Sequence, residues 1–595
     1  MNASQKRSWR WSAAGAALLV GAQAAWADCH LSQLEIPVRI VNHRPIATLT
    51  LNGTEVPMLL DSGAFFSMLP ASTATQLGLP LQNPPRGLVV RGYTGKVEDL
   101  RMTRVEKVGF RDSEIADVDF VVGGNELGSG IQGVLGRNFL SMADTEYDLA
   151  HGVVRLVFPK GECKATNLAD WAGDAPVIVT ALESNAREYA NEVRVAVRIN
   201  GVELRALMDT GAPTTSLRLA SARRADIKEG DLKQSGWASG IGEGRARSWT
   251  GPMASFELGG EKIVDNVVKI DEVDYSRNDM LLGLDYFLSH RIYVSRLQKK
   301  VYATWNGGPV FARNASDRAD DPRYAARPAD VAPDDADALA RRGEAAAARG
   351  ELAKALEDLD RACELAPSSA DNFLARARVH LALRQAAKAR LDLDQALTLK
   401  PDLSEARVTR AALRVSAGQR DGALADLGAL DAGLPPSDQM RERLAGLYAR
   451  LNLAPEALRQ WGLWLPAHGT DVRLAGVLND RCWLRTRLNQ DVAQALEDCK
   501  AAVDKDGGEA LYLDSLGWTY LRLDDARKAV EAFDAAIKLK ALPFAHYGRA
   551  LAEQRLGQAD AARSDLEAAR RLGKDVDERV RVAGLPVAGD APMKP

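Results

Sequence analysis

The chain has 595 residues, more than a single hydrophobic core organises, so we expect roughly two to four domains. Hydrophobic residues make up 46% and charged residues 26%, as in ordinary soluble proteins. The net charge of −3 argues against nucleic-acid binding and against a basic membrane-surface protein. Seven histidines and the lack of HExxH or CxxC spacings argue against a metal site, and no cofactor is predicted.

Residues 1–27 have the pattern of an export signal. Three basic residues precede an apolar stretch from about Ala13 to Ala25, which is shorter than the roughly 20 residues that span a bilayer. Small residues at Ala25 and Ala27 suit a signal peptidase. We predict cleavage near Ala27, a periplasmic or secreted protein, and no later transmembrane segment. An uncleaved membrane anchor is the alternative.

The five cysteines all lie beyond this signal, and in an oxidising compartment some are expected to pair. Cys29 and Cys163 bracket the first of two similar segments, whose terminal strands could bring them together. Cys482 and Cys499 lie in a helical region, where a disulfide and two buried thiols both fit the pattern. Cys363 would be left over.

Residues 40 to 306 contain an internal duplication with an offset of 148 residues. Both copies begin with an alternating strand that ends in Asn-Gly, which predicts a β-hairpin because both residues tolerate positive φ. Eight residues beyond each glycine the copies read Asp-Ser-Gly-Ala and Asp-Thr-Gly-Ala, beginning at Asp61 and Asp209. A glycine follows 31 residues after each aspartate, and an apolar-Gly segment follows at 74 or 75.

These motifs resemble the retropepsin-like (retroviral-type) aspartic proteases, over residues 36–160 and 190–306. The resemblance implies two all-β, barrel-like lobes that share one active site, with a peptide or protein as substrate. By position, it implies a catalytic pair, a supporting loop around each aspartate and a flap from each lobe. These are Asp61 and Asp209; Ser62, Gly63, Ala64, Thr210, Gly211 and Ala212; and Gly92, Tyr93, Gly240 and Ile241. The first lobe keeps the family's arginine as Arg137, whereas the second has Leu284 in its place.

Two carboxylates in one site can perform peptide hydrolysis without a metal. Like charges about 3 Å apart cannot both ionise, so the pair shares a proton. The ionised member can then deprotonate a water while the protonated member donates to the peptide carbonyl. Three alternatives stay open: aspartates that serve only as turn residues, lobes that bind peptides without cutting them, and a homodimer with two separate sites.

The rest of the chain has a different character. Residues 161–189 connect the lobes, and residues 307–335 form a polar linker with several prolines. From residue 336 alanine recurs with a 34-residue period, which is interrupted once by four extra residues; the series runs Ala355, Ala389, Ala423, Ala457, then Ala495 and Ala529.

This period resembles tetratricopeptide (TPR) repeats, about seven of them over residues 336–572. The resemblance implies an all-α superhelix with a concave surface for a protein partner. Residues 573–595 are predicted to be a disordered tail. The leading hypothesis is an exported aspartic endopeptidase whose repeats recruit or position proteins. The main rival is a binding module in which the repeats are the working part.

Overall fold

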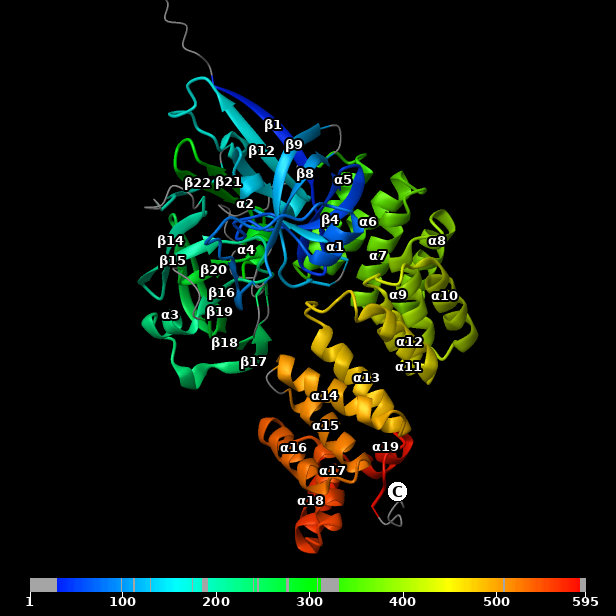
Figure 1. Cartoon of the computed structure of the whole chain (residues 1–595). Helices are drawn as coiled ribbons and strands as arrows, with labels where there is room; N and C mark the ends of the chain where they lie inside the picture. The colour runs from blue at the N-terminus through cyan, green and yellow to red at the C-terminus, as the bar shows by residue number, and fades with distance from the viewer. Residues whose placement is uncertain are drawn as a thin grey trace, which may run out of the picture.

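The computed structural model describes residues 29–588, except 98, 111–112, 129, 174, 184–190, 239, 243–244, 274–277, 308, 312–330 and 507–508. The predicted signal peptide and most of the predicted linker therefore lie outside the described residues. Two β lobes are followed by a curved stack of helices, which begins beside the first lobe and ends beyond the second (Figure 1).

The first lobe is a seven-stranded sheet in the order β2-β3-β4-β10-β5-β9-β8, and an additional β3–β8 pairing closes it. Alternate residues of β3 are buried, as its alternating sequence predicts. The strands are β2 (Arg39–Val41), β3 (Arg44–Leu51), β4 (Thr54–Leu60), β5 (Met68–Leu69), β8 (Arg101–Phe110), β9 (Ser113–Val122) and β10 (Gly133–Leu135). A separate hairpin of β6 (Arg91–Gly92) and β7 (Gly95–Lys96) forms the first flap, and the lobe also contains α1 (Ala71–Gln76) and α2 (Arg137–Leu140).

The second lobe repeats this arrangement. Its sheet has the order β14-β15-β20-β16-β19-β18-β17, and β14 also pairs with β18. The elements are β14 (Arg194–Ile199), β15 (Val202–Met208), β16 (Ser216–Arg218), α3 (Leu219–Arg224), η3 (Glu229–Asp231), β17 (Lys233–Ala238), β18 (Ala246–Leu258), β19 (Glu261–Asp271), β20 (Met280–Leu282) and α4 (Leu284–Ser289).

The two Asn-Gly turns fix the register of both lobes. Asn52 and Asn200 each have φ of 50°, in the left-handed region that such hairpin turns need. Each asparagine side chain also accepts a hydrogen bond from the strand that closes its lobe, from Lys107 N–H of β8 in the first lobe and Ser255 N–H of β18 in the second, both at 3.0 Å. The same 148-residue offset therefore relates these contacts too.

A third sheet joins the lobes, in the order β1-β12-β11-β21-β22-β13. Its strands are β1 (His30–Pro37), β11 (Asp144–Asp148), β12 (Val153–Lys160), β13 (Ile178–Ala181), β21 (His290–Ser295) and β22 (Lys300–Trp305), with η1 (Leu149–His151) after β11 and η2 (Asp170–Ala172) before β13. The inter-lobe connection thus supplies one strand. Antiparallel pairing of β11 with β21 fixes one lobe against the other within a single chain. The disulfide Cys29–Cys163 joins the start of β1 to the end of β12.

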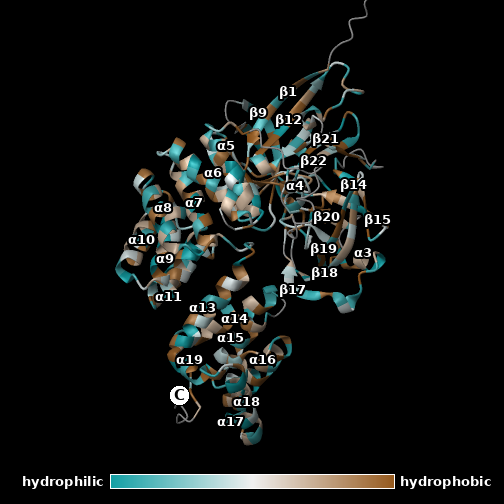
Figure 2. Ribbon diagram, turned by 180° about the vertical axis from the view of Figure 1, so that it is seen from behind, coloured by the Kyte–Doolittle hydropathy of each residue, from teal (hydrophilic) through white to brown (hydrophobic). Residues whose placement is uncertain are grey.

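From residue 336 to residue 572, the described residues form seven antiparallel helix pairs. They are α5 (Ala336–Ala348) with α6 (Leu352–Leu365), α7 (Ala370–Ala382) with α8 (Ala386–Leu399), α9 (Ser404–Ser416) with α10 (Arg420–Gly433), α11 (Arg441–Arg450) with α12 (Ala454–Trp464), α13 (Leu474–Leu488) with α14 (Val492–Asp506), α15 (Ala510–Arg522) with α16 (Ala526–Leu539), and α17 (Pro543–Arg555) with α18 (Ala559–Leu572). Hydrophilic and hydrophobic residues are interspersed along these helices (Figure 2), as expected when each helix buries one face. No helix among the described residues is long and apolar enough to cross a membrane.

An ion pair recurs between the two helices of a repeat, a feature that the sequence analysis missed. In five repeats an arginine of the first helix donates two hydrogen bonds to a buried aspartate of the second. The pairs are Arg342–Asp358, Arg376–Asp392, Arg410–Asp426, Arg481–Asp498 and Arg549–Asp565. Because a guanidinium matches both carboxylate oxygens, each pair fixes the angle between its helices.

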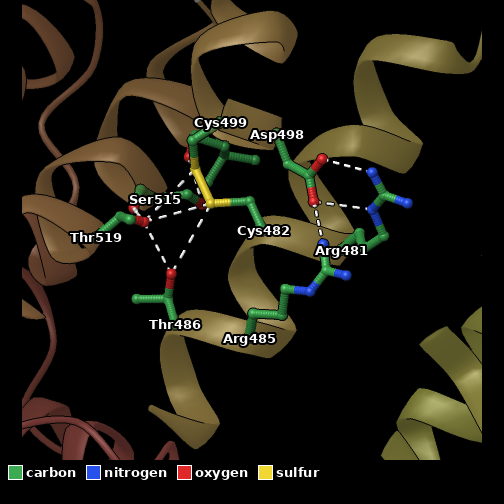
Figure 3. The surroundings of a disulfide bond; sticks show 9 residues. Arg481, Cys482, Arg485, Thr486, Asp498, Cys499, Ser515 and Thr519 are labelled. Carbon is green, nitrogen blue, oxygen red and sulfur yellow. Dashed lines mark hydrogen bonds and ion pairs between the residues drawn. A yellow bond between two sulfur atoms is a disulfide. The ribbon is translucent and has the colours of Figure 1, made fainter. Parts of the chain in front are cut away.

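The second disulfide, Cys482–Cys499, joins α13 to α14, and both cysteines are fully buried. The Cys482 sulfur lies 3.3 Å from Thr519 Oγ1, and the Arg481–Asp498 pair lies beside it (Figure 3). Cys363 is free and buried. The open alternative of two thiols at 482 and 499 is therefore decided in favour of the disulfide.

We expect the double substitution Cys482→Ala and Cys499→Ala to destabilise the repeat domain by about 3 kcal/mol, because the bond closes a loop with a sequence separation of 17. Thermal unfolding followed by helical circular dichroism measures the loss. Hydrogen exchange should accelerate first in α13 and α14. An unchanged melting curve would show that packing alone stabilises this repeat.

The predicted disordered tail is wrong for its first part. Residues 576–582 form α19 (Val576–Val582), and Val576, Val580 and Leu585 are buried against Trp518 and Tyr547. The last repeat would otherwise expose its apolar face, and this short helix covers it. Residues 589–595 lie outside the described residues.

Candidate active site

Each aspartate stands where its central strand ends. Asp61 follows β4 and Asp209 follows β15. Their N–H groups donate to the carbonyls of Leu135 and Leu282, at 3.0 and 2.9 Å, on the parallel neighbouring strands β10 and β20. The apolar-Gly segments recognised in the sequence thus support the aspartate loops from behind.

Four hydrogen bonds cross between the two loops. Ser62 N–H donates to Thr210 Oγ1 at 3.0 Å, and Thr210 N–H donates to Ser62 Oγ at 2.9 Å. The two hydroxyls in turn donate to backbone carbonyls of the opposite lobe, Ser62 to Met208 at 2.9 Å and Thr210 to Leu60 at 2.7 Å. Both side chains are buried, so water does not compete for these bonds. The two loops therefore form one rigid unit.

This unit brings the two carboxyl groups into contact. Asp61 Oδ1 accepts hydrogen bonds from the N–H groups of Gly63 and Ala64, both at 2.8 Å, and Asp209 Oδ1 accepts one from Gly211 at 2.9 Å. The two carboxyl groups also lie close enough for Asp61 to raise the pKa of Asp209. Both aspartates thus occupy one site within one chain, as required for a shared proton.

The environment favours a single negative charge on this pair. Burial, repulsion from the Asp61 carboxylate and the hydrogen bond to it raise the pKa of Asp209 well above its usual range. The backbone N–H groups of Gly211 and Ala212 lower this pKa, but they do not offset the increase. The pair therefore keeps a proton at a pH at which an isolated aspartic acid is ionised.

Two arginines balance the remaining charge. Burial lowers the pKa of Arg137, and the Glu192, Asp61 and Asp209 carboxylates counteract this. Burial likewise lowers the pKa of Arg44, and Asp61 raises it. Arginine remains protonated despite such shifts, so both side chains provide positive charge next to the pair.

The second lobe keeps its structure without the arginine that the family has at Leu284. Arg137 N–H donates to Ala64 O at 2.9 Å, and Leu284 N–H makes the equivalent bond to Ala212 O at 2.8 Å. The Leu284 side chain is buried in the core instead. Only the backbone group is therefore needed to support the second loop.

The residue after this position also has equivalent roles in the two lobes. Asn138 Oδ1 accepts hydrogen bonds from Ser67 N–H and Oγ, at 2.6 and 2.8 Å. Asp285 Oδ1 accepts the same two bonds from Thr215, at 2.9 and 2.6 Å. Burial raises the pKa of Asp285. An amide in one lobe and a carboxyl in the other thus secure the segment that follows each aspartate loop.

The two flaps meet tip to tip. Thr94 N–H donates to Ile241 O at 3.3 Å, and Thr94 Oγ1 donates to Gly242 O at 2.9 Å. The approach needs glycine, because a Cβ on Gly92 would lie 1.9 Å from Ile241 O. The residues assigned to the flaps from the sequence, Gly92, Tyr93, Gly240 and Ile241, therefore lie together at one contact.

Each flap tip also reaches the opposite lobe, and the two contacts differ in chemistry. Ile241 packs into an apolar pocket of the first lobe with Met68 and Val134. Tyr93 donates its hydroxyl hydrogen to Asp271 of the second lobe, and Asp271 is fully buried. The internal symmetry thus extends to the backbone but not to the side chains that the two flap tips contact.

We expect Tyr93→Phe to loosen the first flap, because Asp271 keeps its hydrogen bond from Ser248 at 2.7 Å but loses the one that joins the lobes. KM should rise several-fold with a smaller change in kcat, in steady-state kinetics, since flap closure contributes to substrate binding. Tyr520→Phe, in the repeat domain, is the matched control. If KM stays constant, the bond does not contribute to closure.

One group among the described residues has the spacing of metal ligands: Glu126, His468 and Asp471, all buried. Each ligand atom already has a protein partner. Arg473 donates to both Asp471 oxygens, and the His468 ring nitrogens contact Glu126 and Ser437 O. The chemistry here is that of an ion-paired interface.

Two protein families match parts of this chain. The aspartyl protease family matches residues 47–139 and 195–286, one stretch in each lobe, and the tetratricopeptide repeat family matches residues 511–541. A tetratricopeptide repeat protein from Parabacteroides merdae is 14% identical, with a TM-score of 0.34, over 42% of this chain and 98% of its own. Basic 7S globulin from soybean is 13% identical, with a TM-score of 0.27, over 46% of this chain and 95% of its own. No curated protein matches in sequence. The chain therefore combines two aspartyl protease domains of the retropepsin-like type with a C-terminal tetratricopeptide repeat domain.

Proposed function

We propose that the protein is an exported aspartic endopeptidase in which Asp61 and Asp209 act together on one peptide bond. The observation that carries the proposal is the contact between the two carboxyl groups, maintained by hydrogen bonds that cross between Ser62 and Thr210. A pair fixed in this way suits acid–base chemistry better than a structural role, because two partly buried carboxyls in contact oppose folding unless they share a proton.

In this mechanism the singly protonated pair binds a water molecule between its oxygens. The ionised carboxylate takes a proton from the water, which attacks the carbonyl carbon of the peptide. The protonated carboxyl donates to the carbonyl oxygen as it becomes tetrahedral. The two flaps close over the substrate and exclude bulk water, which strengthens these interactions. The pair titrates as a unit, so the acid and base roles are those of the pair.

The repeat domain would recruit or position a protein, and the protein would work in the periplasm or outside the cell. Two disulfides favour an oxidising compartment. The expected signal peptide favours the same location. The concave surface of such repeats is suited to an extended segment of a partner.

The test is a cleavage-site profile. The purified protein is incubated with a denatured protein mixture between pH 3 and pH 8, and new termini are identified by mass spectrometry. We expect the wild type to cleave at defined sites and a pepstatin-type compound to inhibit this cleavage. The Asp61→Asn variant should not cleave. Asp231→Asn, a change at an exposed residue of the second lobe, is the control. Cleavage by Asp61→Asn at the wild-type rate would refute the proposal. Peptide binding without cleavage by the wild type would instead identify a binding module.

A further inference from the structure

The interruption of the 34-residue period marks a contact with the first lobe. The four extra residues lie between α12 and α13, within residues 465–473, here called the docking loop. Glu126 N–H donates to Thr470 O at 3.3 Å, and Val472 N–H donates to Glu126 O at 3.1 Å. These bonds form a short parallel β-bridge between a protease lobe and the repeat domain.

A buried ion pair lies at the centre of this contact. His468 Nδ1 is 2.5 Å from Glu126 Oε2, and the two side chains are 1% and 2% exposed. His468 Nε2 lies 3.0 Å from Ser437 O, and its ring stacks on Trp464 at a centroid distance of 4.6 Å. Removing one partner would leave the other charge buried and unpaired, which is strongly unfavourable.

The lobe side of this contact also touches the second flap. Residues 123–128 and 130–131, here called the cleft loop, connect β9 to β10, the strand that supports Asp61. Asn125 Nδ2 donates to Gly242 O, in the tip of the second flap, at 3.1 Å. Leu127 packs in the same apolar cluster as Ile241. The cleft loop therefore touches the docking loop through Glu126, and the second flap through the residues on either side of it.

A second contact reaches the same flap from its other end. Arg245, three residues after Gly242, forms an ion pair with Asp506 at the end of α14, whose side chain is 1% exposed. Arg245 also lies 3.4 Å from Glu509. Both views place α14 beside β17, the strand that leads into this flap (Figures 1 and 2). The second flap is thus connected to the repeat domain on both sides.

We propose that the repeat domain helps to hold the second flap in place. In this arrangement His468 and Glu126 are positioning residues that hold the cleft loop against the second flap. This inference rests on the proposed function and adds to it a defined link between the two domains. A partner that shifts the docking loop would change flap closure, and hence substrate binding, without touching the aspartates.

The pair also makes this link depend on pH. Burial lowers the pKa of His468, but the hydrogen bond and charge of Glu126, with Ser437 O and Asp471, outweigh burial and raise it. The other charged group that faces it, Arg473, is neutralised by Asp471 and Glu442. His468 is therefore charged below pH 6.5, the ordinary value, and loses this charge as pH rises through its higher folded pKa. The link therefore weakens as His468 loses its charge.

The test compares two inter-domain ion pairs in the full-length chain. His468→Gln breaks the pair at the cleft loop, whereas Arg39→Gln breaks the Arg39–Glu344 pair between β2 and α5, away from the flaps. We expect His468→Gln to raise KM about tenfold with a smaller change in kcat, because small displacements far from the chemistry strongly affect binding geometry. Its KM should also lose the pH dependence between pH 6 and 8 that the wild type shows. Arg39→Gln should change KM less than about twofold.

Hydrogen exchange separates this inference from the proposed function. In His468→Gln, the peptide that covers residues 236–246 should exchange faster than in the wild type or in Arg39→Gln. If the wild type cuts nothing but this difference is seen, the proposed function fails and the link stands. If cleavage is normal and the two variants behave alike in KM and in exchange, the link is refuted.

Discussion

Replacing Asp209 with asparagine is expected to abolish peptide cleavage and, at the same time, to stabilise the folded protein at neutral pH. The pKa of Asp209 is raised in the folded state, so this state retains a proton that the unfolded chain has lost. The contribution of Asp209 to the free energy of unfolding therefore falls as pH rises from the unfolded pKa near 3.8 through the folded pKa. Asparagine carries no charge, so the variant does not lose this stability as pH rises.

The size of both effects can be measured. Removing one catalytic carboxyl should lower kcat/KM by on the order of 10³-fold or more. Stability should increase by about 1.4 kcal/mol for each pKa unit of the shift, which raises the melting temperature of a domain of this size by roughly 2–4 °C per kcal/mol. Melting curves at pH 5 and pH 8 should diverge between wild type and variant, with the larger gain at pH 8. A lower melting temperature for the variant at pH 8 would mean that the Asp209 carboxyl stabilises the fold.

Sequence reasoning was sufficient for the parts of the fold that repeat. The 148-residue offset predicts two equivalent lobes, because matched Asn-Gly turns and matched Asp-(Ser/Thr)-Gly-Ala segments require matched local structure. The prediction of a bilobal all-β unit followed by a TPR superhelix is confirmed. The supporting role of Ser62 and Thr210, in contrast, was implied by the family resemblance and not by the duplication itself.

The remaining features depend on contacts between segments that share no sequence pattern. Asp271 occupies the position that Gly123 has in the first lobe, so the duplication alone gives no hint that it meets Tyr93. The four-residue interruption of the repeats was visible, but its role needed the position of Glu126, more than 300 residues away in the chain. The short α19 was missed because seven residues with two buried valines look much like a polar tail.

The Arg–Asp pairs of the repeats could be predicted only in part from the sequence. A signal existed, because arginine and aspartate recur at a spacing of 16 in four repeats and 17 in a fifth. This spacing is hard to recognise in the sequence, because both residues are common in these helices and most charged side chains there are solvated. Burial of the aspartates distinguishes these pairs, and burial is a property of the folded stack.

The Gly63→Ala substitution should disable the site while keeping both aspartates. A Cβ at this position would lie 2.4 Å from Asp209 Cγ, about 1 Å closer than an ordinary contact, so one group must move. The crossed hydrogen bonds of Ser62 and Thr210 prevent the loops from separating, so the carboxyl must rotate away from its partner. A misplacement of about 1 Å lowers activity by roughly 10²-fold, and the overpacking costs about 1–3 kcal/mol of stability. Kinetics and thermal melts check both effects.

The duplicated site provides its own comparison for this result. Gly211→Ala would place a Cβ 2.4 Å from Asp61 Cγ, so the two single variants should lose similar activity. Gly230→Ala is the control, because a Cβ there meets no atom within 4 Å. Full activity in either of the first two variants would mean that the carboxyl it approaches is free to move, and that the crossed bonds do not fix the pair. Equal losses, in contrast, would show that both lobes contribute to one site, because each glycine acts on the aspartate of the other lobe.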